Sequence, residues 1–468
     1  MRKSISDVHR QHYVYALWLL LVVALAFLEK LWVITHALYP TPAHIHDVLF
    51  GFSGYVHSLL EHGVYRSCDY LPFIPISNGT CVYTTRMPAL PALLVGLSYI
   101  VGTNMAAVAT AKAAIMSALL GFVMFVWARN ARVTFAAVLV TAISLLGPQV
   151  VKHAAVIDYE EGLLVELMAC HAILLGVLLV RPGPWAIRET AIACVGLVVL
   201  AGLGYLAKTT ILPFLIMTMV FCAVQLRSRP SLAAAVVALG LLPLIAWSFF
   251  SLQTTGRWSL SSSWNGENLL RGFNSESYEI YPDISVDRIF NAKEGVLLDG
   301  RIVPMGHWTN RPPFTDEWQW NDYYAKLATQ WVVSNPIKAV LFSGKKAWAM
   351  FVDVQRVPRK ISAGEEAEPY GALTQLSGIG WMMIARVLFV AFCIGSIVEA
   401  RATRSARALW PLVMVGAYSV PYVIVFASQK HAVPMLVYAG LSFAGTLSRL
   451  REHAGVANPQ SVEATAAA

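Results

Sequence analysis

The sequence predicts an all-α polytopic protein that crosses a lipid bilayer about ten times. The mean hydropathy of the 468 residues is +0.58, and 57% of them are apolar while only 13% are charged. Soluble domains contain about 25% charged residues, so this composition excludes an ordinary water-soluble protein. Apolar runs of about 20 residues, the length that crosses roughly 30 Å of hydrocarbon, recur along the chain. The predicted spans are 14–36, 105–127, 133–151, 163–180, 190–207, 210–225, 231–251, 376–398, 408–427 and 432–448.

The first apolar run is a retained helix, because it is too long for a removable signal peptide and lacks a small-residue cleavage site. Basic residues near span ends stay in the cytoplasm, so Arg2, Lys3 and Arg10 place the N-terminus there. If the spans alternate, every arginine-rich short connection and the C-terminus also face the cytoplasm. Those connections carry Arg129 and Arg132, Arg181 and Arg188, Arg227 and Arg229, Arg401, Arg404 and Arg407, and Arg449 and Arg451. The net charge of +8 is therefore a topology signal and not a nucleic-acid footprint.

A further apolar run, 88–101, is short and rich in proline at its start. Counting it as a span would reverse the side of every later connection, so we expect a helix that lies in the outer interface. Two large segments then face outside, 37–104 and 252–375. The predicted organisation is a transmembrane module 1–251, an outer α or mixed α/β domain 252–375 of about 120 residues, C-terminal transmembrane helices 376–452 and a disordered tail 453–468.

The outer segments contain two further features whose interpretation the sequence leaves open. Cys68 and Cys81 lie thirteen residues apart in the first segment, where an oxidising compartment allows a disulfide or leaves both thiols free. The second segment is rich in tryptophan and tyrosine, which suits either a small hydrophobic core or a sugar-stacking surface.

Five charged residues recur at the outer ends of the predicted spans: Asp47, Arg86, Lys112, Asp158 and Lys208. Charges at or near membrane depth are costly, which makes each of them a functional hypothesis. Three cations and two carboxylates on one face suit transfer chemistry with a phosphate leaving group. Cations neutralise the charge that develops on the phosphate, and a carboxylate takes the proton of an acceptor hydroxyl. The alternative is that each is an interfacial anchor or a helix cap.

The short motifs around these residues have a recognisable order. Asp47 is followed by an amphipathic stretch that ends near Gly63, and Arg86-Met87-Pro88 precedes the interfacial helix. Ala155-Val156-Ile157-Asp158, Gly204-Tyr205-Leu206-Ala207-Lys208 and Gln429-Lys430-His431 follow in later connections. Over residues 14–225 this pattern resembles the GT-C type integral-membrane glycosyltransferases, in particular the lipid A aminoarabinose transferase and the protein O-mannosyltransferases. Two departures are Val48, where the family often has a second acidic residue, and Met87, where it often has proline.

The resemblance implies a GT-C-like fold and an enzyme of the bacterial inner membrane. Such an enzyme transfers a sugar with inversion from a polyprenyl-phosphate donor to a periplasmic glycan, lipid or protein. Asp47 is then the general base and Asp158 a second catalytic carboxylate, while Arg86, Lys112, Lys208 and Arg386 bind the donor phosphate. The residues expected to contact sugar or acceptor are His46, Tyr55, Glu161, Trp264, Glu267 and Asn268. Because Val48 removes an acidic pair, neither a metal nor another cofactor is expected.

Two other classes of membrane protein compete with this interpretation. Lipid-linked glycan polymerases and ligases also have a large outer loop, but they tend to place essential arginine and histidine there and no aspartate in the first loop. Transporters and flippases usually have repeated halves and midplane charges. Here the two outer segments differ in size, and the polar groups gather at one face.

Overall fold

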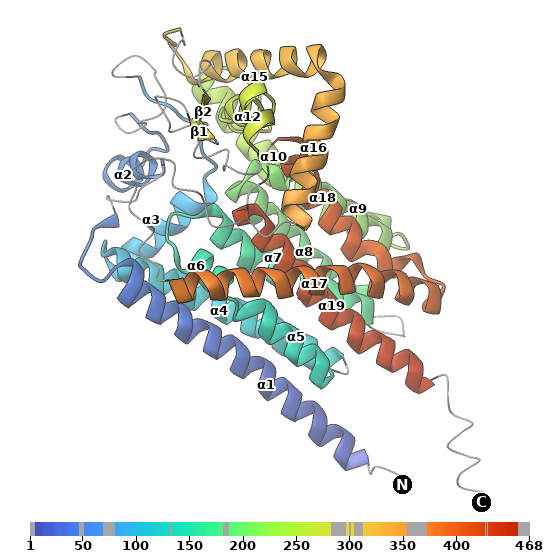
Figure 1. Cartoon of the computed structure of the whole chain (residues 1–468). Helices are drawn as coiled ribbons and strands as arrows, with labels where there is room; N and C mark the ends of the chain where they lie inside the picture. Colours follow the sequence, from blue (N-terminus) through green and yellow to red (C-terminus); the bar gives the residue numbers. More distant parts are fainter. Residues whose placement is uncertain are drawn as a thin grey trace, which may run out of the picture.

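The computed structural model describes residues 5–45, 51–68, 80–131, 133–180, 187–281, 296–298, 301–303, 312–352, 372–425, 427 and 429–456. Over these ranges the chain forms a bundle of long helices with shorter helices gathered at one end (Figure 1). The elements are α1 (Ile5–Trp32), η1 (Val33–Leu38), α2 (Ser53–His62), α3 (Ala89–Val101), α4 (Met105–Asn130), α5 (Phe135–Leu145), α6 (Pro148–Ala155), α7 (Glu160–Val180), α8 (Ile187–Ala207), η3 (Thr209–Ile211), α9 (Leu212–Gln225), α10 (Pro230–Thr255), α11 (Asn265–Gly272), α12 (Ser275–Ile280), β1 (Val296–Leu298), β2 (Arg301–Val303), α15 (Glu317–Ser334), α16 (Pro336–Phe351), α17 (Ala372–Thr403), η4 (Ala406–Leu409), α18 (Trp410–Ile424) and α19 (Gln429–Val456).

Each of the ten predicted spans falls on helix, but the number that qualifies as membrane-spanning is smaller. In the described part of the chain, seven helices are long and apolar enough to cross a membrane, or eight if the bent pair α5–α6 is one span. The helix Thr209–Gln225 is apolar but short, and α19 falls outside the qualifying set. The chain is thus a multi-pass membrane protein. Helix α19 also continues through Val456, four residues into the predicted tail, and residues 457–468 lie outside the described ranges.

The bend of 53° between α5 and α6 has a local cause. Gly147 precedes Pro148, and the residue before a proline is disfavoured in helical conformation. Proline also lacks the N–H that would continue the hydrogen-bond ladder. Trp381 of α17 packs against Gly147 and donates from Nε1 to the carbonyl of Ile143 at 2.8 Å. The bend is therefore stabilised by a tertiary contact and directs α6 toward the region of interest below.

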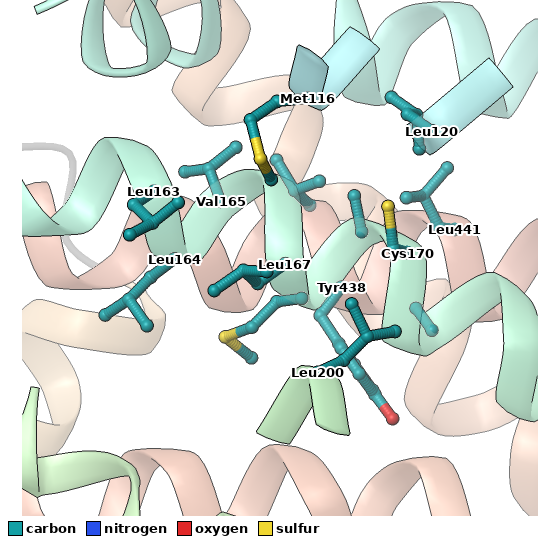
Figure 2. Close-up of a cluster of buried hydrophobic side chains, with 14 of the residues drawn as sticks. Met116, Leu120, Leu163, Leu164, Val165, Leu167, Cys170, Leu200, Tyr438 and Leu441 are labelled. Atoms are coloured by element: carbon teal, nitrogen blue, oxygen red, sulfur yellow. The ribbon is translucent and has the colours of Figure 1, made fainter. Parts of the chain in front are cut away.

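The core of the bundle forms where α4, α7, α8 and α19 meet. Figure 2 shows this cluster, with Met116 and Leu120 from α4, Leu163 and Leu167 from α7, Leu200 from α8, and Tyr438 and Leu441 from α19. Small residues let helices approach closely, as where Gly440 of α19 lies against Ser144 of α5. Helix α19 is buried over most of its length, which places its first turn inside the assembly of helices.

Two buried ion pairs join helices within the bundle. Lys30 Nζ of α1 lies 2.5 Å from Glu166 Oε1 of α7, and it also donates to Ser117 of α4 at 3.4 Å. Arg449 of α19 contacts Glu399 of α17 through two nitrogen–oxygen contacts of 2.5 and 2.9 Å. An unpaired charge in an apolar interior costs several kcal/mol, so each charge requires its partner.

The two predicted outer segments lie together at the end of the bundle away from both termini (Figure 1). Ser263 N donates to Thr84 O at 2.9 Å, which joins the segment 37–104 directly to the segment 252–375. Strands β1 and β2 pair antiparallel, with Val296 opposite Val303. The second segment is therefore mixed α/β, with most of its described residues in helix. Its independent folding as a domain stays a prediction.

The aromatic residues of the second outer segment form mainly a core. Trp320 and Tyr324 of α15 are fully buried and contact each other edge to face at 5.7 Å. Trp264, Phe273 and Phe342 belong to the same cluster. In the first outer segment, Cys68 and Cys81 form the disulfide that the sequence left open. Helix α3 confirms the helix expected at 88–101, and its position in the interface stays a prediction.

Single and double substitutions test the buried pair of Lys30 and Glu166. We expect Lys30→Met or Glu166→Leu alone to lower the free energy of unfolding by about 3–5 kcal/mol, because each leaves one charge unpaired. The double variant should be much closer to the parent protein, since both charges are gone. Thermal unfolding in detergent, followed by size-exclusion chromatography, measures this. Equal losses in all three variants would contradict the pairing.

Candidate active site

The site is centred on Arg86, which lies in the segment before α3. Tyr65 Oη donates to the backbone carbonyl of Arg86 at 3.0 Å. The guanidinium lies over the rings of Phe52, at 5.0 Å, and Trp264, at 4.5 Å. Gly51 has a φ of +80°, and a Cβ added there would lie 3.2 Å from Arg86 Nη2. Glycine is therefore needed at position 51 both for the backbone conformation and for the approach of the guanidinium.

Four further charged or titratable side chains are connected to Arg86 by successive contacts and form with it what we call the ionic cluster: Arg86, Glu160, Glu161, Lys208 and His431. Glu160 lies 3.4 Å from Arg86 Nη1 through one oxygen and 3.4 Å from Lys208 Nζ through the other. Glu161 Oε1 lies 2.6 Å from Lys208 Nζ and 3.3 Å from His431 Nε2. The cluster thus brings together the first outer segment, the start of α7, the connection after α8 and the first turn of α19.

Lys208 is held in its charged form. Burial lowers the pKa of Lys208, but Glu161, Tyr422 and Glu160 together raise it more, so the net shift of the pKa is upward. The ammonium also lies 5.8 Å from the ring of Tyr422, against which His431 stacks at 4.4 Å. Tyr418 Oη in turn donates to the backbone carbonyl of His431 at 2.9 Å. The positive charge of Lys208 is therefore fixed in place by its surroundings.

Asp158 and Lys112 lie next to the cluster, Asp158 in the turn that connects α6 to α7 and Lys112 in α4. Lys112 is fully buried, and its Nζ donates to the carbonyl of Val156 at 2.7 Å, at the C-terminal end of α6. Asp158 is half-buried, and burial raises the pKa of its carboxyl group to about 6, against the attraction of Lys112 and Arg86. Asp158 is therefore mostly ionised at pH 7. Lys112 acts on the backbone of this turn and not directly on the cluster.

Tyr55 contacts the two residues that flank or hold Arg86, namely Thr85 and Tyr65. It is buried, its hydroxyl lies 2.6 Å from Thr85 Oγ1, and its ring stacks on that of Tyr65 at 4.5 Å. The two tyrosines therefore hold the carbonyl of Arg86 and the side chain of the preceding Thr85.

The other residues expected in the site have different surroundings. Trp264 packs on Arg86, as given above, whereas Glu267 is fully buried and forms an ion pair with Arg271 one turn along α11. Asn268 is half-buried at the same helix. Arg386 donates from Nη2 to the carbonyl of Ala349 at 3.3 Å, at the contact of α17 with α16. His46 and Asp47 lie outside the described residues.

Glu317 is a contributor that the sequence did not reveal. Its carboxylate accepts hydrogen bonds from Tyr83 N at 3.2 Å, Thr84 N at 3.1 Å, Thr84 Oγ1 at 3.0 Å and Ser263 Oγ at 3.1 Å. It thereby attaches the segment that carries Arg86 to the first residue of α15. In the sequence, Asp316 and Glu317 are typical of an ordinary helix N-terminus, so no local signal marks this role.

Glu160 and His431 were also outside the predicted site. The signal available for Glu160 was its place beside Glu161 and two residues after Asp158. Across the described ranges, no group of three or more histidine, cysteine, aspartate or glutamate side chains is arranged to hold a metal ion. Metal-independent catalysis stays a prediction.

Substitution of Glu317 tests its role as a positioning residue. In Glu317→Ala, two backbone N–H groups lose their partner at a cost of about 1–3 kcal/mol each, so the segment 82–86 should open more often. Hydrogen–deuterium exchange of peptides that cover residues 80–86 should rise severalfold. The matched control is Asp322→Ala on the same helix as Glu317, which removes an exposed ion pair with Arg257. Unchanged exchange in Glu317→Ala would show that the segment is held by other contacts.

No protein-family model and no curated protein matches the chain. Two solved structures do, both crystal structures of ArnT from Cupriavidus metallidurans, one in the apo state and one bound to undecaprenyl phosphate. Each match covers 94% of this chain and 79% of that chain at 15% identity, with TM-scores of 0.36 and 0.37. ArnT is a lipid A aminoarabinose transferase of the GT-C type, the kind of protein that the sequence motifs resemble. A likeness of this extent leaves the function to be inferred from the residues of this chain.

Proposed function

We propose that the chain is an inverting glycosyltransferase that uses a polyprenyl-phosphate sugar as donor. The observation that carries this proposal is the convergence of Arg86 and Lys208, which are distant in sequence, on the carboxylates of Glu160 and Glu161. Two cations held close together beside membrane helices suit an anionic group attached to a lipid. The acceptor is a periplasmic glycan, lipid or protein.

The distances support different roles for the two cations. The contact between Arg86 and Glu160 is 3.4 Å, longer than the 2.7–2.9 Å of a strong charge-assisted hydrogen bond. A phosphate can therefore replace this contact at small cost, and a guanidinium held between two aromatic rings presents a planar edge that matches two phosphate oxygens. The contact between Lys208 and Glu161 is 2.6 Å, the length of a strong charge-assisted hydrogen bond, so a phosphate would not easily replace it. We assign Arg86 as the main phosphate ligand and Lys208 as a fixed positive charge behind it.

The remaining residues are assigned from their positions. Lys112 positions the turn that carries Asp158, and Asp158 orients a hydroxyl of the sugar or a basic partner. Tyr55 positions Arg86, and Trp264 covers the guanidinium at the edge of the site. Arg386 joins α17 to α16 through its hydrogen bond to Ala349. A second contact of Arg386 with the phosphate stays a prediction.

Asp47 remains the proposed general base. Gly51 and Phe52, which follow it closely in sequence, both lie against Arg86. This proximity supports a role for the preceding residues at the same phosphate. The Asp47 carboxylate takes the proton of the acceptor hydroxyl, the acceptor oxygen bonds to the anomeric carbon, and the bond from that carbon to the phosphate oxygen breaks. The polyprenyl phosphate leaves with the electron pair, and attack from the opposite face inverts the anomeric centre.

We place the enzyme in a bacterial inner membrane with both termini in the cytoplasm and the ionic cluster on the periplasmic side. The arginine-rich short connections support this orientation. So does the separation of both termini from α15, β1 and β2 along the bundle (Figure 1).

Asp47→Asn separates catalysis from binding. We expect sugar transfer from a radiolabelled polyprenyl-phosphate sugar in membranes to fall by at least a hundredfold, because the amide cannot accept the proton. Donor binding and thermal stability should be unchanged. Retained transfer would remove Asp47 from the role of base, and movement of the intact donor lipid across the bilayer without transfer would favour a flippase.

Arg86→Gln tests the phosphate contact. We expect affinity for polyprenyl phosphate to fall by about 10- to 100-fold, which corresponds to the loss of roughly 1.5–3 kcal/mol from a charged hydrogen bond. Titration calorimetry in detergent measures this. Arg257→Gln is the matched control, since that arginine forms an exposed ion pair with Asp322 away from the cluster. Equal affinity in the Arg86 variant and the parent protein would contradict the assignment.

A further inference from the structure

Helix α16 turns an apolar face outward. Ile337, Leu341 and Trp348 follow each other at helical spacing on one side of the helix, and Val340 and Val352 flank them. These five side chains are between 47% and 76% exposed. The opposite side carries the residues that α16 buries against its neighbours, namely Ala339, Phe342, Lys346 and Met350. The helix therefore has one apolar face packed on protein and a second one with no protein against it in the described part of the chain.

The preceding helix has the opposite character on its exposed side. The exposed positions of α15 are Gln319, Asp322, Lys326, Thr329, Gln330, Val333 and Ser334, which are polar except in the last turn. The two helices are joined at Asn335 and meet at a corner (Figure 1). The surface thus changes from polar to apolar at this corner, as it would where a chain passes from water into lipid.

Of the three lysines of α16, Lys346 is buried, whereas Lys338 and Lys345 are exposed and contact Tyr278. Lys345 Nζ donates to the carbonyl of Tyr278 at 3.2 Å, and Lys338 Nζ lies 5.9 Å from the ring of Tyr278. Lys346 is fully buried and donates to the carbonyls of Gly272, Ile424 and Val425. The row of Ile337, Leu341 and Trp348 is therefore apolar, and the exposed Lys338 and Lys345 border it on the side that faces Tyr278.

The outward stripe is continuous with the apolar surface of the membrane helices. Phe351, the last residue of α16, stacks on Phe389 of α17 at 5.3 Å, and α16 packs along α18. Val387 and Val390 of α17 and Val420 of α18 are exposed apolar residues of helices that qualify as spans.

We infer that α16 is embedded in the outer leaflet of the bilayer, with Ile337, Val340, Leu341 and Trp348 in contact with lipid. A helix of 16 residues extends roughly 24 Å, so it can descend from the interface into one leaflet without crossing the membrane. The occupant of the exposed face is lipid and not a protein partner, because the face joins that of the spans.

This placement has a consequence for the ionic cluster. Lys346 ties α16 to Gly272 at the end of α11, and Trp264, which precedes α11, packs on Arg86. A helix anchored in the leaflet thereby holds Arg86 at a set depth relative to the lipid surface. The inference about α16 itself does not depend on the proposed enzymatic function.

Site-directed spin labelling tests the inference in the full chain in liposomes of phosphatidylethanolamine and phosphatidylglycerol. Val340→Cys is labelled in a Cys393→Ser background, since the other three free cysteines are buried. The matched control is Thr329→Cys on the exposed face of α15. Ile337→Cys and Gly344→Cys are alternative exposed sites on α16 if the first variant folds poorly.

We expect the ratio of oxygen accessibility to nickel-chelate accessibility to be severalfold higher at position 340 than at position 329, because oxygen partitions into lipid and the chelate does not. Equal chelate accessibility at the two positions would place α16 in water. Low accessibility to both reagents would show that a protein partner or a second copy of the chain covers the face. Either result overturns the inference.

Discussion

Charge pairing in a chain solvated largely by lipid is the constraint on which this structure depends. Glu160 and Glu161, side by side at the start of α7, lie within 3.4 Å of the two cations of the ionic cluster and of the His431 imidazole, whose pKa burial lowers to about 4. Each of these groups would be costly if left alone beside an apolar bundle. The requirement that they meet therefore fixes the first outer segment, the turn after α8 and the first turn of α19 relative to α7.

Around this cluster, the groups that touch a ligand can be distinguished from the groups that hold them. Arg86 and Lys208 offer positive charge. Tyr65 and Glu317 hold the backbone at Arg86 and Thr84, and Tyr55 holds the side chain of Thr85. Glu317 belongs to the second outer segment and serves a residue of the first. The two outer segments are therefore one structural unit at the site, although the helices α4 to α10 lie between them in the sequence.

Within the helix bundle, charge pairing joins helices and does not form a binding site. Lys30 with Glu166, and Arg449 with Glu399, are closed pairs in which both partners are buried. They join helices and offer no exposed charge to a ligand. Helix α16 shows the complementary case, since Lys346 is buried against backbone carbonyls and the row of Ile337, Leu341 and Trp348 on the outward face is apolar, which suits a lipid neighbour.

The sequence by itself determined the helical membrane architecture, the helix positions and the location of Arg86, Lys208 and Glu161 near one face, because hydrophobic length and the side of basic residues are local properties. Ten spans stay a prediction, since seven helices of the described ranges, or eight with the bent pair α5–α6 as one span, are long and apolar enough to cross a membrane. Tertiary structure decided that Lys112 donates to a backbone carbonyl and that Glu267 pairs with Arg271. It also decided that His431 reaches the cluster and that Glu317 holds the segment before Arg86. Those contacts join residues far apart in the chain, and the direction of a side chain across such a distance is set by packing that no local pattern contains.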